Sequence, residues 1–325
     1  MKRYKIADVV FDAEINYEYT KNLCQAYEYE GEEKPVFHAV VSKEDIAAEK
    51  VLVKNFPDDY AESLALFRKL CEYALSEADG IIFHSSAIMV DGEAYLFIAP
   101  SGTGKSTHTR LWREMLGERA VMINDDKPIV RFVDGDFYAY GTPWNGKHHL
   151  GTNCRAKIKA ICSIYQSPQN TIRKANFPEM IVKVLNQTLR PREQEKMDKL
   201  LSLIDKMLTS VELYSLGCDV SREAAELSYK TMSQGEAFMK IKDGFILRKV
   251  ADSYIVVAVG ERVKDFNGVI NLNETGAFLW KLLEKGNDHE GLKNALLEEY
   301  NVQEAVAEKD VKAFMNKLME AGLVK

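Results

Sequence analysis

The segment APSGTGKST, residues 99–107, has the residue types and the spacing of a phosphate-binding loop. Small residues let backbone N–H groups wrap around phosphates, Lys105 can neutralise the terminal ones, and the Ser106 hydroxyl can reach a magnesium ion. The apolar run EAYLFIA precedes the loop and a helical pattern follows it, which is the context that this motif requires. We therefore expect ATP, or another nucleoside triphosphate, and Mg2+ to bind at Ser101, Gly102, Thr103, Gly104, Lys105, Ser106 and Thr107.

A second group of candidate catalytic residues is acidic. The apolar run VMIN ends in Asp125 and Asp126. Two adjacent carboxylates at the end of a strand can divide two tasks, because one can orient Mg2+ while the other accepts the proton of an incoming hydroxyl. Such a pair alone is often a solvated turn, but its place directly after the helix of the phosphate loop favours catalysis. His84 lies one strand upstream of the loop. Alone it is weak evidence for a catalytic role, because most single histidines are structural.

The elements around these residues predict a mixed sheet. GIIFHSSAIMV and EAYLFIA flank the turn dipeptide Asp91-Gly92, and PIVRFV and DFYAYG flank Asp134-Gly135. Such dipeptides between apolar runs predict antiparallel hairpins inside an otherwise α/β nucleotide-binding core. Further along, KIKAICSIYQ and VELYSLGC read as strands, and residues 178–191, 193–209 and 221–232 as helices.

Three regions are expected: an N-terminal α+β region (1–79) that packs on the core, a catalytic domain (80–234) and a small α+β domain (235–325), with the junction at residues 233–237. In the first region PVFHAVV reads as a strand. A helix that ends at Gly80 places Leu64, Phe67, Leu70, Cys71, Ala74 and Leu75 on one stripe. In the third, FMKIK, FILRKV, SYIVVAV and GVINL read as strands and precede three helices, the first capped by Asn273 and ended by Gly286.

Composition excludes several classes of function. The formal net charge is −6 and the isoelectric point is near 5.7, which argues against a nucleic-acid binder. Acidic residues interrupt the N-terminal run, so no signal peptide is expected, and no run approaches the roughly 18 apolar residues of a membrane span. The five scattered cysteines lack CxxC spacing and are expected to be buried thiols in a reducing cytoplasm.

Together, FHSSAIMVDGEAYLFIAPSGTGKST and VMINDD resemble the catalytic domain of HPr kinase/phosphorylase and its relatives, over about residues 80–165. The resemblance implies a P-loop core related to phosphoenolpyruvate carboxykinase. By that similarity Asp125 would be the base at the substrate hydroxyl, Asp126 would bind magnesium with Ser106, and His84 would lie beside the phosphates. Which aspartate takes which role stays open.

The segment GTPWNGKHHLG, residues 141–151, replaces the glycine-rich signature that follows the aspartates in HPr kinases. It resembles the Gly-Thr-Pro-aromatic loop of HPr-kinase-like proteins encoded with peptide natural-product clusters. Lys147 or Arg155 could stabilise a transferring phosphoryl group, and a structural loop with exposed cations is an equal alternative. No zinc site is expected at His148 and His149.

Residues 236–325 resemble the PqqD-like family through GVINLNETGAFLWKLLEKG and through EKDVKAFMNKLMEAGLVK with its Asp310-Val311 pair. Members often bind the leader segment of a ribosomally made precursor peptide, which adds as a strand to an open sheet edge. The alternative is that the apolar residues only form a winged-helix-like core. These are Phe278, Leu279, Trp280, Leu282, Phe314 and Leu318.

The two modules together predict a cytoplasmic, ATP-dependent kinase that phosphorylates a hydroxyl side chain, serine first, of a precursor peptide with a leader segment. Asp125, Asp126, His84 and Lys105 are the expected catalytic residues, with Ser106 and Asp126 as magnesium ligands. Alternatives are a nucleotide-switched peptide chaperone without phosphotransfer and a small-molecule or carrier-protein kinase. The resemblance leaves a homo-oligomer open, since HPr kinases form hexamers.

Overall fold

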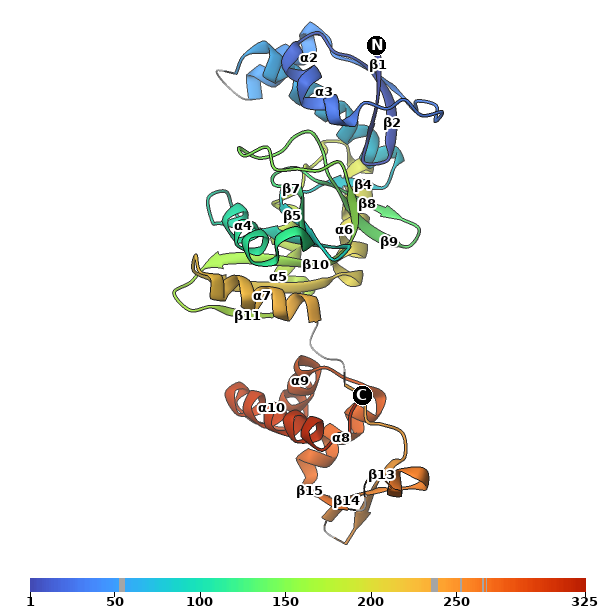
Figure 1. Cartoon of the computed structure of the whole chain (residues 1–325), viewed down its shortest axis with the longest axis vertical. Coiled ribbons are helices and arrows are strands. Elements are labelled where there is room, and N and C mark those ends of the chain that lie inside the picture. Colours follow the sequence, from blue (N-terminus) through green and yellow to red (C-terminus); the bar gives the residue numbers. More distant parts are fainter. Residues whose placement is uncertain (53–55, 235–238, 252, 265, 267) are drawn as a thin grey trace. The chain divides into compact units, whose positions relative to one another are not determined.

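The computed structural model describes residues 1–52, 56–234, 239–251, 253–264, 266 and 268–325. The chain forms two compact units, residues 1–233 and 234–325, and Figure 1 follows the chain through the elements of both. Residues 1–79 belong to the first unit. The expected junction at 233–237 lies mostly outside the described residues, and the division into three domains stays a prediction.

A mixed sheet is the centre of the first unit. Within the described ranges it has nine strands, and a path of hydrogen-bonded neighbours runs β4-β8-β9-β10-β6-β5-β7, with β12 on β10 and β11 on β12. Their bounds are β4 (Gly80–Ile82), β5 (Ser86–Val90), β6 (Glu93–Ile98), β7 (Ala120–Asn124), β8 (Ile129–Val133), β9 (Asp136–Tyr140), β10 (Arg155–Gln166), β11 (Thr171–Lys174) and β12 (Glu212–Cys218).

Both predicted hairpins are confirmed. Strand β5 pairs antiparallel with β6, and β8 pairs antiparallel with β9. The turn residues Asp91 and Gly92 have φ values of 51° and 87°, and Asp134 and Gly135 have 51° and 92°. Positive φ at both positions matches the twist of antiparallel strands, which explains the Asp-Gly sequences. The long strand β10 pairs parallel with β6 and β12, so the predicted mixed α/β fold is confirmed.

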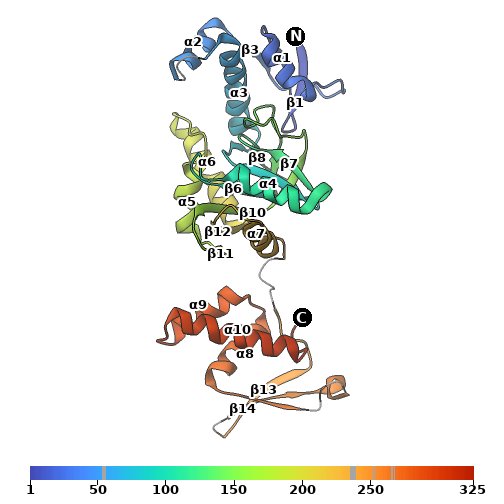
Figure 2. The same ribbon diagram turned by 60° about the vertical axis from the view of Figure 1, so that its left-hand side comes forward.

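Helices cover both faces of this sheet. The helices are α4 (Lys105–Leu116), α5 (Phe177–Leu185), α6 (Gln194–Ser210) and α7 (Arg222–Gln234). Side chains alternate along β6, so that Tyr95 and Phe97 pack with α4 and α7 while Leu96 and Ile98 pack with α5 and α6. Figure 2 shows α5 and α6 beside one another. The predicted helix over 178–191 ends early, at Leu185, and the chain that follows joins the sheet edge instead.

The N-terminal region packs on this core. It contains β1 (Lys2–Ile6), β2 (Val9–Glu14), α1 (Glu18–Cys24), β3 (His38–Val40), α2 (Lys43–Leu52) and α3 (Asp58–Glu77), and β1, β2 and β3 form a small sheet. Its buried residues share one cluster with Ile82, Ile129 and Trp144 of the core. One detail of the expected helix is wrong, because α3 ends at Glu77 and Gly80 begins a strand. Five of the six residues of the expected stripe are buried, and the sixth, Leu64, is partly buried.

The described residues of the second unit form three strands followed by three helices. These are β13 (Phe245–Val250), β14 (Ser253–Ala258), β15 (Val269–Leu272), α8 (Glu274–Lys285), α9 (His289–Glu299) and α10 (Glu304–Glu320). The Asn273 side chain accepts from the Gly276 N–H and so caps α8, as predicted. The FMKIK segment is not a strand, since its described part makes only isolated bridges at Met239 and Ile241. Leu279, Trp280 and Leu318 are buried in the core of this unit, with Phe278, Leu282 and Phe314 packed against it.

Two further expectations concern single features. Cys24, Cys71, Cys162 and Cys218 are buried free thiols as expected, whereas Cys154 is only partly buried. Across the described ranges, no helix combines the length and apolar character that a bilayer crossing needs.

Candidate active site

The topology of the sheet brings the candidate residues to one edge. Strand β5 lies between β6 and β7 and runs antiparallel to both, so β6 and β7 end where β5 begins. Ser86 at the start of β5 pairs with Phe97 of β6, and Ala87 pairs with Asn124 of β7. The phosphate loop after β6, the aspartates after β7 and His84 before β5 therefore meet at the same edge.

The phosphate loop turns from β6 directly into α4. Gly102 and Gly104 have φ values of 82° and 121°, which side chains rarely allow, and a Cβ at either would meet no atom within 4 Å. The N-terminus of α4 adds its free N–H groups to those of the loop. Lys105 is buried, and its Nζ donates to the Ala99 carbonyl over 2.8 Å. This backbone arrangement fits a polyphosphate.

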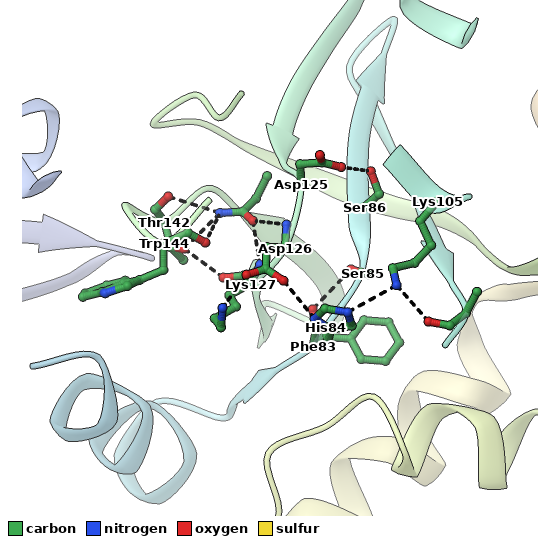
Figure 3. A network of polar contacts seen from close by, with 12 residues as sticks. Phe83, His84, Ser85, Ser86, Lys105, Asp125, Asp126, Lys127, Thr142 and Trp144 are labelled. Atoms are coloured by element: carbon green, nitrogen blue, oxygen red, sulfur yellow. Dashed lines mark hydrogen bonds and ion pairs between the residues drawn. The ribbon is translucent and has the colours of Figure 1, made fainter. Parts of the chain in front are cut away.

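A chain of polar contacts joins Lys105 to Asp126. Figure 3 shows His84 between the two, with its Nε2 3.2 Å from Lys105 Nζ and its Nδ1 3.0 Å from Asp126 Oδ1. A neutral imidazole with its proton on Nδ1 satisfies both contacts, because it accepts from the ammonium and donates to the carboxylate. The Lys127 ammonium contacts the other oxygen, Asp126 Oδ2.

These contacts set the electrostatics of the site. Burial opposes ionisation of Asp126, yet hydrogen bonds from His84 and Lys127 outweigh it and lower the pKa of that carboxyl to about 2. Burial lowers the pKa of Lys105, and the charges of Asp126 and Asp125 oppose this effect. Asp126 therefore stays ionised near neutral pH and is a poor proton acceptor.

Asp125 is held by a separate set of contacts. It is buried, and its Oδ1 accepts from the Ser86 hydroxyl over 2.6 Å. Ser86 Oγ lies 2.8 Å from Thr109 Oγ1, one turn along α4 from Lys105. The two aspartates thus connect to the first turns of α4 by different routes. Asp126 connects through His84 to Lys105 (Figure 3), and Asp125 connects through Ser86 to Thr109.

The neighbouring segment 141–151 fixes the turn that carries the aspartates. The Asn124 side chain accepts from the N–H groups of Asp126 and Lys127 over 2.8 and 2.7 Å, and it donates to the Thr142 carbonyl. Thr142 in turn donates to the Lys127 carbonyl over 2.8 Å. Trp144 is buried and donates to the Ser63 carbonyl of α3 over 3.0 Å. The Thr-Pro-Trp sequence therefore has a positioning role, and Gly146 lies against Asp125.

Five residues of the site make contacts that the sequence did not predict: Asn124, Ser86, Thr109, Lys127 and Thr142. Asn124 was visible as the residue before the acidic pair, but only the fold pairs its side chain with Thr142. Of the two cations proposed near the phosphate, Arg155 instead bonds Asp8 and Tyr140, while Lys147 is exposed on the 141–151 loop.

A cavity of about 400 Å3 adjoins the phosphate loop. Thr103, Gly104 and Thr107 line one side, and Gln166, Ser167 and Asp219 line the other. Its position beside the loop suits the nucleoside of a bound nucleotide.

Magnesium needs few protein ligands in such a site. No cluster of three or more His, Cys, Asp or Glu side chains occurs in the part of the chain that the structure describes. Magnesium at a nucleotide usually takes one or two protein oxygens and fills its other positions with phosphate and water. Ser106 is exposed on α4, and the Asp126 carboxylate keeps lone pairs beyond its contacts with His84 and Lys127. These donors fit the ion.

Comparison with known proteins identifies part of the second unit. Residues 255–324 match the PqqD family, described as coenzyme PQQ synthesis protein D. The predicted PqqD domain is therefore confirmed. No curated protein matches the chain significantly.

The chain is also similar to three solved structures over parts of its length. The chain is similar to TbiB1 in complex with the TbiA(beta) leader peptide, at 24% identity and a TM-score of 0.23 over 26% of this chain and 94% of that one. It is similar to lasso peptide synthetase B1 complexed with the leader peptide, at 21% identity and a TM-score of 0.24 over 27% and 99%. It is also similar to the Hpr(Ser) kinase/phosphatase from Coxiella burnetii, at 8% identity and a TM-score of 0.28 over 47% and 93%.

Proposed function

We propose that the chain is an ATP-dependent kinase that phosphorylates a serine hydroxyl of a ribosomally made precursor peptide. The observation that carries this proposal is the meeting of a phosphate loop and two consecutive aspartates at one sheet edge, with different environments for the two carboxylates. A site that only binds nucleotide needs the loop, whereas transfer to an alcohol also needs a proton acceptor beside it.

The two aspartates divide the chemistry. The hydroxyl oxygen of the substrate forms a bond to the terminal phosphorus, the bond from that phosphorus to the diphosphate breaks, and Asp125 takes the hydroxyl proton. Ser86 holds the Asp125 carboxylate through Oδ1 and leaves Oδ2 for the proton. Lys105 neutralises the phosphates, and His84 keeps Lys105 and Asp126 in place. A magnesium ion held by Ser106 and Asp126 would supply further neutralisation of phosphate charge.

The PqqD domain supplies the peptide. Two of the similar structures are complexes with leader peptides, and we assign the same kind of ligand to this domain. Strand β13 lies at an edge of the small sheet, and β14 is its partner strand among the described residues. A leader segment can pair with that edge. Binding of the leader raises the local concentration of the acceptor residue at the kinase site.

Mass spectrometry tests the proposal. The peptide of a neighbouring short open reading frame is incubated with the full chain, ATP and Mg2+, and a gain of one phosphate group on a serine is expected. Nucleotide binding or hydrolysis without a phosphopeptide would contradict the kinase and favour the nucleotide-switched chaperone.

A further inference from the structure

A groove runs from the candidate active site along the side of the first unit. Two cavities of about 350 and 630 Å3 share five lining residues, Glu49, Leu52, Arg68, Ile82 and Leu189, so they lie next to one another. The smaller cavity also contacts His84 and Lys127, and the larger one contacts Arg190 and Arg192. We call these two adjoining cavities the side groove. One end of the side groove therefore opens at the catalytic residues.

The walls of the side groove are apolar in the middle. Phe67 of α3 and Ile82 of β4 line it from within the core. Leu52 and Leu189, from two different segments, line both cavities and are 59% and 43% exposed. They give the side groove an apolar surface that an apolar side chain of a bound peptide can contact.

The far end of the side groove carries a small excess of positive charge. Among the acidic residues lining it, Glu49 pairs with Arg68, Asp45 with Lys69 and Glu193 with Lys196. Arg190 and Arg192 are exposed and form no ion pair with a described carboxylate. Of the described lining acids, Glu72 alone forms no ion pair, although its charge acts on Arg68. The unpaired charges are therefore two arginines against one glutamate, which favours an anionic ligand group.

Backbone pairing gives the distance between the two ends. The His84 N–H donates to the Gln187 carbonyl over 2.7 Å, Phe83 bridges Thr188, and the Leu189 N–H donates to the Ile82 carbonyl. The chain from Gln187 onward thus runs antiparallel to residues 82–84 and away from the active site. At about 3.3 Å per extended residue, Arg190 lies roughly 10 Å beyond the level of His84, and Arg192 lies further along.

We propose that the side groove binds the acceptor segment of the substrate peptide in an extended form, with an acidic residue three to five positions from the phosphorylated serine. The acidic side chain pairs with Arg190 and Arg192, and apolar residues between it and the serine cover Leu52 and Leu189. The inference rests on the proposed kinase function, and it adds a second recognition element to the leader-binding PqqD domain.

Synthetic peptides test this specificity on the full chain. Each peptide has one serine in a neutral background and one aspartate at a position from five residues before to five residues after it, with asparagine in the matched peptide. We expect aspartate at three to five positions on one side to raise kcat/KM by about tenfold or more, mainly through KM, as for a charge-assisted pair.

Charge reversal gives the decisive variant. Arg190→Glu with Arg192→Glu should cancel the preference for aspartate and create a preference for lysine at the same positions. Lys34→Glu with Lys230→Glu has the same net charge change, and both lysines are exposed and line neither cavity of the side groove. This control should keep the aspartate preference. Thermal unfolding of each variant detects a loss of folding, and the exchanged preference cannot arise from instability.

Three results would overturn the inference. A phosphorylated precursor without any aspartate preference in the synthetic peptides would remove the groove assignment and leave the kinase intact. A change in the mass of the assembly on charge reversal, measured by light scattering, with unaltered peptide kinetics would assign the groove to contact between copies of the chain. Failure to phosphorylate either the precursor or any synthetic peptide would remove the proposed function and this inference together.

Discussion

At the scale of single residues, the two aspartates differ in their surroundings although they are adjacent in sequence. Asp126 lies between His84 and Lys127 and has a pKa of about 2, whereas Asp125 accepts one neutral hydroxyl bond from Ser86. A carboxylate between two donors of this kind binds cations well and protons poorly. The environments therefore support the division of roles that the HPr kinase resemblance implies.

Asp125→Asn tests the proton acceptor. The amide keeps the shape of the side chain and an oxygen for Ser86, so the site should stay folded, but it cannot take the hydroxyl proton. We expect peptide phosphorylation to fall by about 10²-fold or more, with nucleotide affinity nearly unchanged. Initial rates and calorimetric titration with nucleotide measure the two quantities. Transfer near the wild-type rate would exclude Asp125 as the base.

Gly146→Ala tests the space beside Asp125. A Cβ at this position would lie 3.3 Å from both the carbonyl oxygen and Oδ2 of Asp125, which is tight enough to shift the carboxylate. We expect kcat to fall by roughly three- to tenfold, because small displacements of a catalytic group are costly. An unchanged kcat in this variant would show that the 141–151 segment shifts to make room for the added methyl group and that the Asp125 carboxylate stays in place.

At the scale of elements, the helix of the phosphate loop is anchored by a buried polar cluster. Ser228 of α7 accepts from Trp112 Nε1 over 2.9 Å, lies 2.8 Å from His108 Nε2 and donates to the Ala225 carbonyl. The single Ser228 proton can go to the Ala225 carbonyl or to His108 Nε2, and in the first case His108 donates through Nε2. The cluster joins α4 to α7 beneath the phosphate loop.

His108 should make the stability of α4 depend on pH. Burial lowers the pKa of His108 from 6.5 to about 4, so below pH 6.5 the unfolded chain binds a proton that the folded chain does not. As far as His108 is concerned, the folded state is therefore most stable above pH 6.5. The free energy of unfolding decreases as pH falls toward 4, by roughly 2 kcal/mol between pH 7 and pH 5.

Hydrogen exchange of the α4 amides, corrected for intrinsic rates, measures this loss. His108→Gln keeps a donor for Ser228 and removes the titration, so the difference between pH 7 and pH 5 should shrink by that amount. An equal pH dependence in both proteins would show that folding does not lower the pKa of His108.

Local sequence chemistry was enough for the hairpins and the phosphate loop. Asp-Gly dipeptides and the glycines at positions 102 and 104 favour backbone conformations with positive φ. The hairpins and the phosphate loop that contain them could therefore be predicted within a residue or two. Pairings between distant segments were not visible in the same way. The extended chain after Leu185 continues an apolar helical pattern, but it pairs with Phe83 and His84. The roles of Asn124 and Ser86 depend on side-chain contacts across strands that only the fold creates.

At the scale of the whole molecule, the chain consists of two compact units. The buried residues of the PqqD-containing unit form a cluster of their own around Trp280, so this unit has its own hydrophobic core. Under the proposed function, binding of the leader raises the effective concentration of the acceptor segment at the kinase site and does not change the rate of the chemical step there. The benefit should therefore appear in KM and be confined to substrates that carry the leader.

Competition by free leader peptide tests this coupling on the full chain. Saturating leader should raise KM for the leader-bearing precursor by about tenfold or more and leave kcat nearly unchanged, because tethering acts through effective concentration. The same addition should not affect a short peptide that contains only the acceptor segment, since that peptide uses the kinase unit alone. A scrambled leader of equal composition is the control. Equal inhibition of both substrates would show that the leader binds at the kinase site itself. No inhibition of either substrate would show that the PqqD domain does not contribute to substrate binding.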